Sequence, residues 1–480
     1  MIQFINGLFS VVFSIFESII TGVSDLIVTA SPSKRKENFN ASFMDANKIL
    51  SGNGKGFCVT GNLCLSIQDS YSNSLCFGGS GSGKSSRVLI PSILKVNTSS
   101  LVVHDPSKEC FLATSGAKEE QGYKVKVLNY SNPEFSENFN PLERVKNISD
   151  IKKLSKILIQ TSLGTNSKDP YWNLSGEQLL TLFIRYILYH TDKKYHTLYN
   201  VLCLLNTFSG TPKKVDILFV QTKDDDLLSQ YKSAVALDSK MLQSIVQTVR
   251  TALSIFADPQ VAQITSTDTI YFESFRKEKI ILYINNNVAD MRYFTVLSSI
   301  FFEQFFASVM NSLPKQNDIP IFFLLDEASS LYLNILPTAI SNIRKYNSGI
   351  MQVYQSQSQL LDLYGMQQAR NIIANSYSKI YMAGQPLETA RELESILGKF
   401  TYVDNENIQR TRSLMTMDEI RILKEEAIIL CGNLPPIKAK MIPYYEQKEL
   451  KRLTSLPTYS IQKNEYEEEL ETINIDGKTE

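Results

Sequence analysis

A glycine-rich segment at residues 78–85, Gly-Gly-Ser-Gly-Ser-Gly-Lys-Ser, constrains the fold more than any other feature of this chain. A short apolar stretch at 74–77 precedes it, and a helical pattern follows at 85–96. In such a loop the glycines let main-chain N–H groups point inward as a nest for phosphate, and the helix adds its positive dipole end. The predicted phosphate-binding residues are Gly78, Gly79, Ser80, Gly81, Ser82, Gly83, Lys84, Ser85 and Ser86.

The spacing G-x-x-x-x-G-K-[ST] assigns separate roles to two of these residues. Lys84 would reach the β- and γ-phosphates of a nucleotide as a catalytic residue, and the Ser85 hydroxyl would hold Mg²⁺. A flexible Gly/Ser linker is the alternative, but a linker needs neither the strand before the segment nor the helix after it. The segment therefore predicts a site for ATP with Mg²⁺.

A second apolar stretch, at 319–325, ends abruptly in two acidic residues, Asp326 and Glu327. Mg²⁺ and an attacking water both need carboxylates at the end of a strand near the phosphate loop. We expect Asp326 to bind the Mg²⁺ shell and Glu327 to polarise the water that attacks the γ-phosphate. For the pair alone, the capping of a helix is the alternative.

Two further candidates lie around the strand expected at 349–354. Gln355 follows this strand, and its amide could touch the γ-phosphate or the water as a catalytic sensor; a helix cap is the alternative. Arg344 lies on the preceding helical pattern at 338–346 and could reach the nucleotide of a neighbouring subunit as an arginine finger. A solvated basic face accounts for Arg344 nearly as well.

Strand-like and helix-like segments alternate along most of the chain, which predicts an α/β fold with a mainly parallel sheet and helices on both faces. Residues 166–272 interrupt this rhythm with long helical patterns and predict an inserted all-α domain. The nucleotide-binding core then comprises 75–165 and 273–450, after a linker with short strands at 31–74. The expected strands are 74–77, 101–104, 123–128, 279–284, 319–325, 349–354, 379–382 and 427–430.

The two ends of the chain have unusual compositions. Residues 1–30 are mostly apolar, contain no Lys or Arg, and predict an amphipathic helix that attaches to a membrane or packs on protein. The basic residues at 34–36 suit a cytosolic flank or anionic head groups. Residues 464–480 hold seven acidic residues and one lysine, so 451–480 is expected to be a disordered acidic tail.

The overall charge excludes a chain-wide basic surface, because 49 Lys and Arg balance 49 Asp and Glu. Contacts with nucleic acid must then come from local clusters. Six cysteines and three histidines are scattered without a CxxC pair, which argues against a structural zinc site and for reduced thiols in the cytosol.

Together, these residues resemble the coupling-protein ATPases of type IV secretion and conjugation, the TraG/TraD family. The matching pieces keep the family's order over about residues 41–450. Their order and spacing are more specific than any single piece. The pieces are 78–85, 102–109, 139–142, 169–172, 325–327, 355–356 with 359–360, 364–365, 389–391, 397–398 and 436–445.

The resemblance implies a RecA-like P-loop NTPase core with an all-α inserted domain, and a homo-oligomeric ring, usually hexameric. It implies a location at the cytoplasmic face of the bacterial inner membrane, held by the N-terminus or by a partner's anchor. The implied partners are DNA, the relaxase with other relaxosome proteins, and components of the type IV secretion channel. The family typically opens with two transmembrane helices, whereas this chain offers at most one such segment.

With this resemblance, the sequence predicts an ATP-hydrolysing coupling protein that recruits DNA with its relaxase and translocates it to the channel during conjugation. Two alternatives stay open. The cargo could be effector proteins, or the chain could be a membrane-docked adaptor that binds nucleotide only for assembly. The Asp326–Glu327 pair argues against the adaptor, which has no need of a catalytic base.

Overall fold

The computed structural model describes four parts of the chain. The amphipathic helix expected at 1–30, and residues 31–39 of the expected linker, lie outside them. Within the described parts, no helix combines the length and the apolar character that a membrane crossing requires. The described residues are 40–163, 170–286, 290–464 and 470–473.

The chain divides into two compact units. The smaller unit consists of Met1–Ser42 and Gly398–Leu414. Its described part is built on an antiparallel hairpin of β8 (Lys399–Val403) and β9 (Gln409–Ser413), to which the Ala41 amide adds a hydrogen bond of 3.0 Å. The larger unit comprises Phe43–Leu397 and Met415–Glu480.

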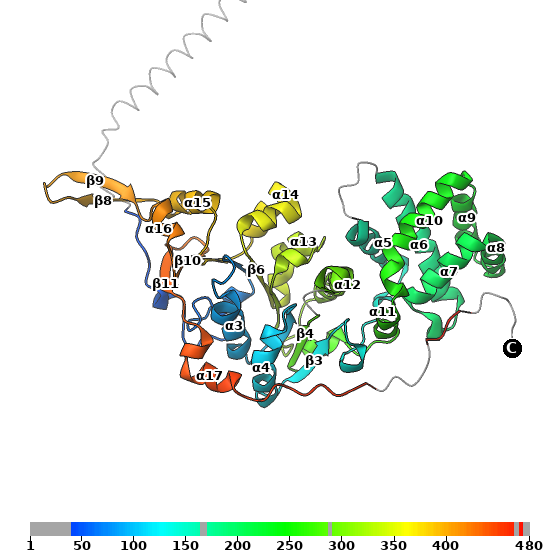
Figure 1. Ribbon diagram of the computed structural model, residues 1–480, viewed down its shortest axis with the longest axis horizontal. Coiled ribbons are helices and arrows are strands. Elements are labelled where there is room, and N and C mark those ends of the chain that lie inside the picture. The colour runs from blue at the N-terminus through cyan, green and yellow to red at the C-terminus, as the bar shows by residue number, and fades with distance from the viewer. Residues whose placement is uncertain (1–39, 164–169, 287–289, 465–469, 474–480) are drawn as a thin grey trace, which may run out of the picture. The chain divides into compact units, whose positions relative to one another are not determined.

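A nine-stranded sheet forms the centre of the larger unit (Figure 1). The strands from β7 to β3 pair in parallel, and β10 and β11 extend the β7 edge through two antiparallel pairings, so that only β10 runs in the opposite direction. Apolar side chains on the parallel strands are buried, as expected for a sheet covered on both faces. In spatial order the strands are β11 (Ile437–Lys440), β10 (Glu426–Cys431), β7 (Ser378–Tyr381), β1 (Ser74–Phe77), β6 (Ser348–Tyr354), β5 (Ile321–Leu325), β2 (Ser100–His104), β4 (Ile280–Ile284) and β3 (Lys124–Leu128).

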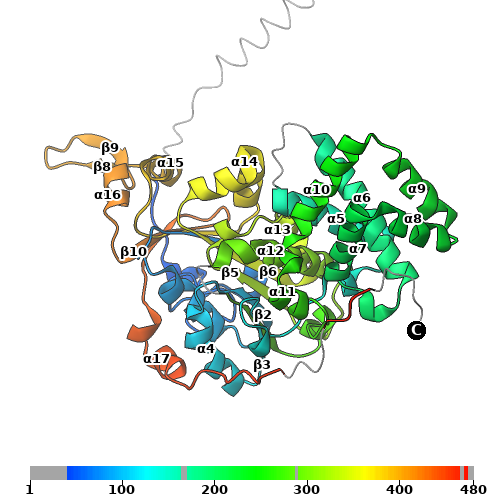
Figure 2. The same cartoon turned by 45° about the vertical axis from the view of Figure 1, so that its right-hand side comes forward.

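Helices cover both faces of this sheet (Figures 1 and 2). On β5, Phe322 and Leu324 belong to one buried cluster with α3 and α4. The intervening Phe323 points to the opposite face, where its ring contacts Phe305 of α12 with centroids 5.2 Å apart. The predicted α/β fold with a mainly parallel sheet and helices on both faces is confirmed. These helices are α3 (Ile90–Lys95), α4 (Glu109–Glu120), α12 (Met291–Val309), α13 (Leu336–Asn342) and α14 (Gln357–Ala374).

All the predicted strands are present, with bounds shifted by no more than one or two residues. The hairpin strands β8 and β9 and the edge strand β11 were not predicted. β9 has the sequence Gln-Arg-Thr-Arg-Ser and is exposed along most of its length, so no apolar alternation marks it. β11 is short and carries two lysines. An exposed strand such as β9, and a strand as short as β11, leave little trace in the sequence.

Between β3 and β4 the chain forms a helical bundle without a strand among its described residues. α5 packs on α6 and α10, and α10 also packs on α7. By its packing, α5 therefore joins the bundle, although it lies before residue 166, where the all-α domain was expected to begin. The helices are α5 (Ile148–Leu163), α6 (Pro170–His190), α7 (Leu198–Gly210), α8 (Pro212–Gln221), α9 (Asp225–Val235), α10 (Ser239–Leu253) and α11 (Pro259–Ile264).

The C-terminal segment is packed where the structure describes it, so the expected disorder of 451–480 is wrong for these residues. α17 (Lys448–Thr454) packs on α4. Beyond it, the Pro457 carbonyl oxygen would lie only 1.9 Å from a Cβ at Gly116 of α4, so the absence of a side chain there makes the contact possible. Farther on, the Asn200 side chain donates to the Glu471 carbonyl at 3.0 Å. The apolar side chains of this segment that pack on the core are Leu456, Tyr459 and Ile461.

Candidate active site

Four parallel strands end at the same edge of the sheet, and the candidate residues follow them directly. The order β1-β6-β5-β2 places β6 between the strand of the phosphate loop and the strand of the acidic pair. Gly78 follows β1, Gln355 follows β6, Asp326 follows β5 and Asp105 follows β2. The carboxyl ends of parallel strands are where open α/β sheets bind their ligands. The fold thus gathers residues that are far apart in the sequence.

The phosphate loop has a main-chain geometry that requires glycine. Gly81 and Gly83 have φ angles of 75° and 83°, in a region where other residues are strained. A Cβ on Gly78 would lie 2.5 Å from Ser82 Oγ, which leaves no room for a side chain. Ser82 Oγ is buried and has no hydrogen-bond partner among the described residues. The loop therefore presents a polar atom that an added ligand could satisfy.

The Lys84 side chain turns back on the loop. Its Nζ donates to the carbonyl oxygens of Gly78 at 2.8 Å and Gly79 at 3.3 Å. Ser85 begins a π-helical turn, Ser85–Leu89, which continues into α3 and brings a helix N-terminus to the loop. A phosphate in the loop would offer the ammonium group a charged partner in place of neutral carbonyls.

The turn after β5 holds the Glu327 carboxylate. Glu327 lies in the left-handed region, with φ 50° and ψ 55°. Ser329 Oγ donates to Glu327 Oε1 at 2.6 Å, and Gln355 Nε2 lies 3.3 Å from each carboxylate oxygen. The main-chain N–H of Gln355 donates to Gln359 Oε1 at 2.8 Å. The predicted base and the predicted sensor are therefore linked through their side chains.

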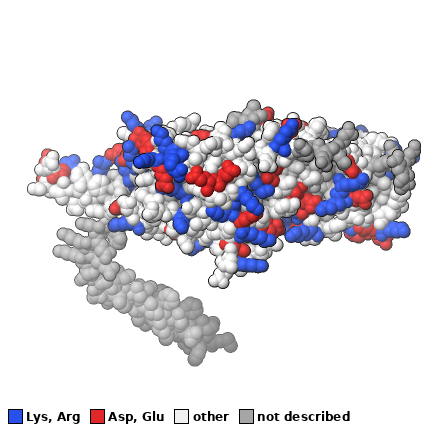
Figure 3. All heavy atoms as spheres, turned by 90° about the horizontal axis from the view of Figure 1, so that it is seen from below, with Lys and Arg blue, Asp and Glu red and all other residues white. Residues whose placement is uncertain are grey.

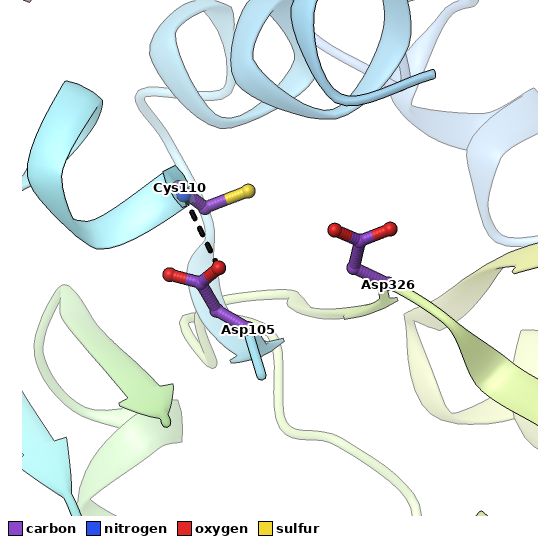
Figure 4. A group of neighbouring side chains, drawn as sticks. All are labelled: Asp105, Cys110 and Asp326. Atoms are coloured by element: carbon purple, nitrogen blue, oxygen red, sulfur yellow. Dashed lines mark hydrogen bonds between the residues drawn. The ribbon is translucent and has the colours of Figure 1, made fainter. Parts of the chain in front are cut away.

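Asp326 faces a second buried carboxylate, Asp105, and the thiol of Cys110 (Figure 4). The ligand atoms of these three residues lie within 4.8 Å of one another. Asp105 also accepts the Cys110 and Phe111 main-chain N–H groups at 3.2 and 2.7 Å, which holds the first turn of α4. Burial raises the pKa of Asp105 to about 6. Burial, followed by the charge of Asp105, raises the pKa of Asp326 to about 7.

The two carboxylates suit a hard divalent cation such as Mg²⁺, which prefers oxygen ligands. Ionised carboxylates buried side by side repel each other, and a cation between them would offset the repulsion. Burial and the nearby carboxylates raise the pKa of the Cys110 thiol, which therefore stays neutral. Asp326 and Asp105 could hold the metal, and the Ser85 hydroxyl stays a predicted third ligand.

His104 forms a hydrogen bond with the main chain at Asp326, and the sequence did not indicate this role. Its Nδ1 donates to the Asp326 carbonyl at 2.8 Å, and burial lowers the pKa of the imidazole to about 4, so the ring is neutral near pH 7. One signal could have identified it. Like Asp326 and Glu327, these polar residues come at the end of an apolar strand: His104 is the last residue of β2, and Asp105 follows it. Ser329 carried no signal, since a serine two residues after an acid is common.

The structure does not bring Arg344 to the site of its own chain. Arg344 is exposed in η10 (Ile343–Tyr346), before β6, whereas the site residues come after the strands. The seven residues of β6 separate the two edges of the sheet by about 20 Å. A role for Arg344 at the nucleotide of a neighbouring subunit stays a prediction.

Comparison with known sequences identifies the family. The sequence matches the family described as "Type IV secretory system Conjugative DNA transfer" over residues 24–469. Protein VirD4 of Rhizobium radiobacter is 24% identical over 406 residues, which cover 79% of this chain and 58% of that protein. The type IV secretion system-coupling protein VirD4 of Bartonella henselae is 24% identical over 464 residues, 86% of this chain and 68% of that protein. The chain thus spans little more than half the length of the first of these relatives.

Solved structures of the plasmid coupling protein TrwB have the same fold. Its complex with a non-hydrolysable GTP analogue aligns with a TM-score of 0.67 at 17% identity, over 85% of this chain and 97% of that one. Its complex with ADP and Mg²⁺ gives a TM-score of 0.65 at 18% identity, over 84% and 94%. The predicted RecA-like core is confirmed by this likeness. From the match over residues 24–469, the chain belongs to the type IV secretory system conjugative DNA transfer family.

Proposed function

We propose that this chain is an ATP-hydrolysing coupling protein that recruits DNA with its relaxase and translocates it to a type IV secretion channel during conjugation. The observation that carries the proposal is the hydrogen-bonded pair of Glu327 and Gln355 at the strand ends beside the phosphate loop. An adaptor that binds nucleotide only for assembly has no use for an oriented carboxylate at this place. Membership of the family supports the DNA cargo.

ATP would bind with its phosphates in the loop of residues 78–86. The main-chain N–H groups and the Lys84 ammonium would hold the β- and γ-phosphates at the positive end of the helix. Mg²⁺, when bound, offsets the negative charge of the phosphate oxygens. Asp326, Asp105 and the Ser85 hydroxyl offer the oxygen atoms that would hold it. The TrwB complex with ADP and Mg²⁺ supports this choice of nucleotide and metal.

Glu327 would act as the general base for hydrolysis. Its carboxylate orients a water molecule and accepts a proton as the water attacks the γ-phosphate. Gln355 lies at the end of β6, between the phosphate loop and the acidic pair, so its amide can respond to the loss of the γ-phosphate. α14 begins two residues later, at Gln357. A shift of Gln355 would therefore be passed directly to α14.

The proposal extends to the assembly. A homo-hexameric ring at the cytoplasmic face of the bacterial inner membrane would receive relaxosome proteins and DNA and pass them to the channel. Residues 1–30 or a partner would anchor the ring, and Arg344 would reach the neighbouring subunit's nucleotide. The face shown in Figure 3 carries basic and acidic side chains intermixed. On that face, contacts with DNA phosphates would therefore come from small clusters rather than from a broad basic surface.

The deciding measurement is Mg²⁺-dependent ATP hydrolysis by the full chain, with and without single- and double-stranded DNA, beside the variant Glu327→Gln. Stimulation by DNA that disappears in the variant is the expected result. Hydrolysis that DNA does not change would point to protein cargo. A ring that assembles with nucleotide but hydrolyses none would overturn the proposal in favour of an adaptor.

A further inference from the structure

The hydroxyl of Ser329 makes the shortest contact to the Glu327 carboxylate. Ser329 Oγ donates to Oε1 at 2.6 Å, whereas the Gln355 amide lies 3.3 Å from both oxygens. A hydrogen bond to an ionised acceptor is short and stronger than one between neutral groups. Of these two donors, the serine therefore contributes more to the orientation of the carboxylate.

This contact is local, so it does not depend on a nucleotide. Ser329 lies only two residues after Glu327, in the short 3₁₀ turn η9 (Ala328–Ser330). A glutamate side chain has several rotatable bonds and a broad terminal torsion, and it samples many orientations when nothing holds it. A donor from the same turn limits that sampling before any substrate arrives.

The turn that carries Ser329 is itself held from two sides. Thr295 Oγ1 of α12 donates to the Ser330 carbonyl at 3.4 Å. After the turn, the Leu333 main-chain N–H donates to the Tyr364 hydroxyl of α14 at 3.2 Å. Leu331 and Leu333 are buried. The position of the Ser329 hydroxyl is thus fixed by packed helices rather than by a free loop.

We propose that Ser329 is a positioning residue for ATP hydrolysis: it holds the Glu327 carboxylate in the orientation that receives the proton of the attacking water. This inference rests on the proposed function, because it assigns a role within that reaction. Among the contacts described, Ser329 touches neither the phosphate loop nor the buried carboxylates of Asp105 and Asp326. Its loss should therefore lower turnover and leave nucleotide binding intact.

The test compares steady-state ATP hydrolysis by the full chain and three variants. Ser329→Ala should lower kcat about 10-fold, which corresponds to about 1.4 kcal/mol, and leave KM unchanged. Ser329→Thr keeps the hydroxyl and should restore most of the turnover. Ser330→Ala is the matched control, because the Ser330 hydroxyl donates to the Glu327 main-chain carbonyl at 2.8 Å and not to its carboxylate. It should keep kcat near the wild-type value.

Three results would overturn the inference while the wild-type chain hydrolyses ATP. They are an unchanged kcat in Ser329→Ala, an equal fall in Ser329→Ala and Ser330→Ala, and a Thr variant as slow as the Ala variant. Failure of the proposed function looks different, because the wild-type ring would then be as inactive as Glu327→Gln. That result would remove both proposals together.

Discussion

The phosphate loop and the acidic turn after β5 lie at the same edge of one sheet, but they are built in different ways. The loop depends on main-chain geometry: Gly81 and Gly83 have positive φ angles, Lys84 contacts neutral carbonyls, and the Ser82 hydroxyl is buried without a partner among the described residues. The acidic turn depends on side chains, and Glu327 is held without any ligand. In the function proposed above, the binding half would be completed by its ligand, whereas the catalytic half is assembled in advance.

The largest effect should come from Glu327→Gln, which damages only the acidic turn. An amide cannot accept the proton of the attacking water, so ATP turnover should fall about 10³-fold. The affinity for a fluorescent ATP analogue with Mg²⁺ should stay as in the wild-type chain. Loss of nucleotide binding in this variant would show that the two halves are not separable.

A pH-dependent effect should come from Glu303, which supports the segment after the acidic turn. Its Oε1 accepts the Ile335 main-chain N–H at 2.9 Å, and burial raises its pKa from 4.5 to about 7. The folded chain keeps this proton up to about pH 7, while the unfolded chain releases it near pH 4.5. This group therefore makes the folded state less stable as pH rises through that window, by up to about 3 kcal/mol.

The variant Glu303→Gln keeps the shape of the neutral acid and should remove this contribution. Urea unfolding at about pH 5 and about pH 8 measures the difference in the free energy of unfolding. The wild-type chain should lose more stability between the two pH values than the variant does. Identical pH dependence in both would show that Glu303 is ionised in the folded chain.

A smaller effect is expected when the phosphate loop is altered and the acidic turn is left intact. In Gly78→Ala the new Cβ would lie 2.5 Å from Ser82 Oγ and 3.1 Å from the Met382 Cβ, so the loop must shift. The affinity for the ATP analogue should fall about 30-fold, which corresponds to about 2 kcal/mol. If this substitution damages only the phosphate loop and not the acidic turn, saturating ATP should restore much of the turnover.

The smallest effect should come from Gly81→Ala. A Cβ at this position meets no atom within 4 Å, so only the φ of 75° opposes the substitution. That strain costs about 1 kcal/mol, or about fivefold in affinity. A larger loss of affinity in Gly81→Ala than in Gly78→Ala would contradict this order. It would show that the loop changes shape when nucleotide binds.

The parts of this molecule that were predictable are those with a local signature. The apolar strands at 319–325 and 349–354 end in polar residues, and this pattern located Asp326, Glu327 and Gln355. The contact between Glu327 and Gln355 could be anticipated, because a residue at the end of a neighbouring strand is expected nearby. The role of each residue in the reaction stays a prediction.

Other features depended on contacts that no local pattern encodes. The approach of Asp105 to Asp326 follows from the pairing of β2 with β5, two strands that are not consecutive in the sequence, so no local pattern shows that they are neighbours. The packing of the C-terminal segment depends on the missing side chain at Gly116, far away in the sequence. Its acidic composition suggested disorder, although Leu456, Tyr459 and Ile461 were visible as apolar anchors.

The central place of β1 in the sheet has a consequence for the order of folding during synthesis. Both neighbours of β1, the strands β6 and β7, are made much later than β1 itself. The Asn73 side chain, just before β1, accepts the Ile350 main-chain N–H at 3.0 Å across a separation of 277 residues. The sheet can therefore close around the phosphate loop only after Tyr381 has left the ribosome.

The helices of the bundle, α5 to α11, have all been made once Ile264 has been added, well before that point. Contacts between residues close in sequence form fastest, and chains fold in segments as they emerge. The bundle should therefore fold first on the ribosome, while β1 waits with both of its edges unpaired. A nascent chain stopped before β6 would have its helical bundle and no nucleotide site, and it would depend on chaperones to cover its open strand edges.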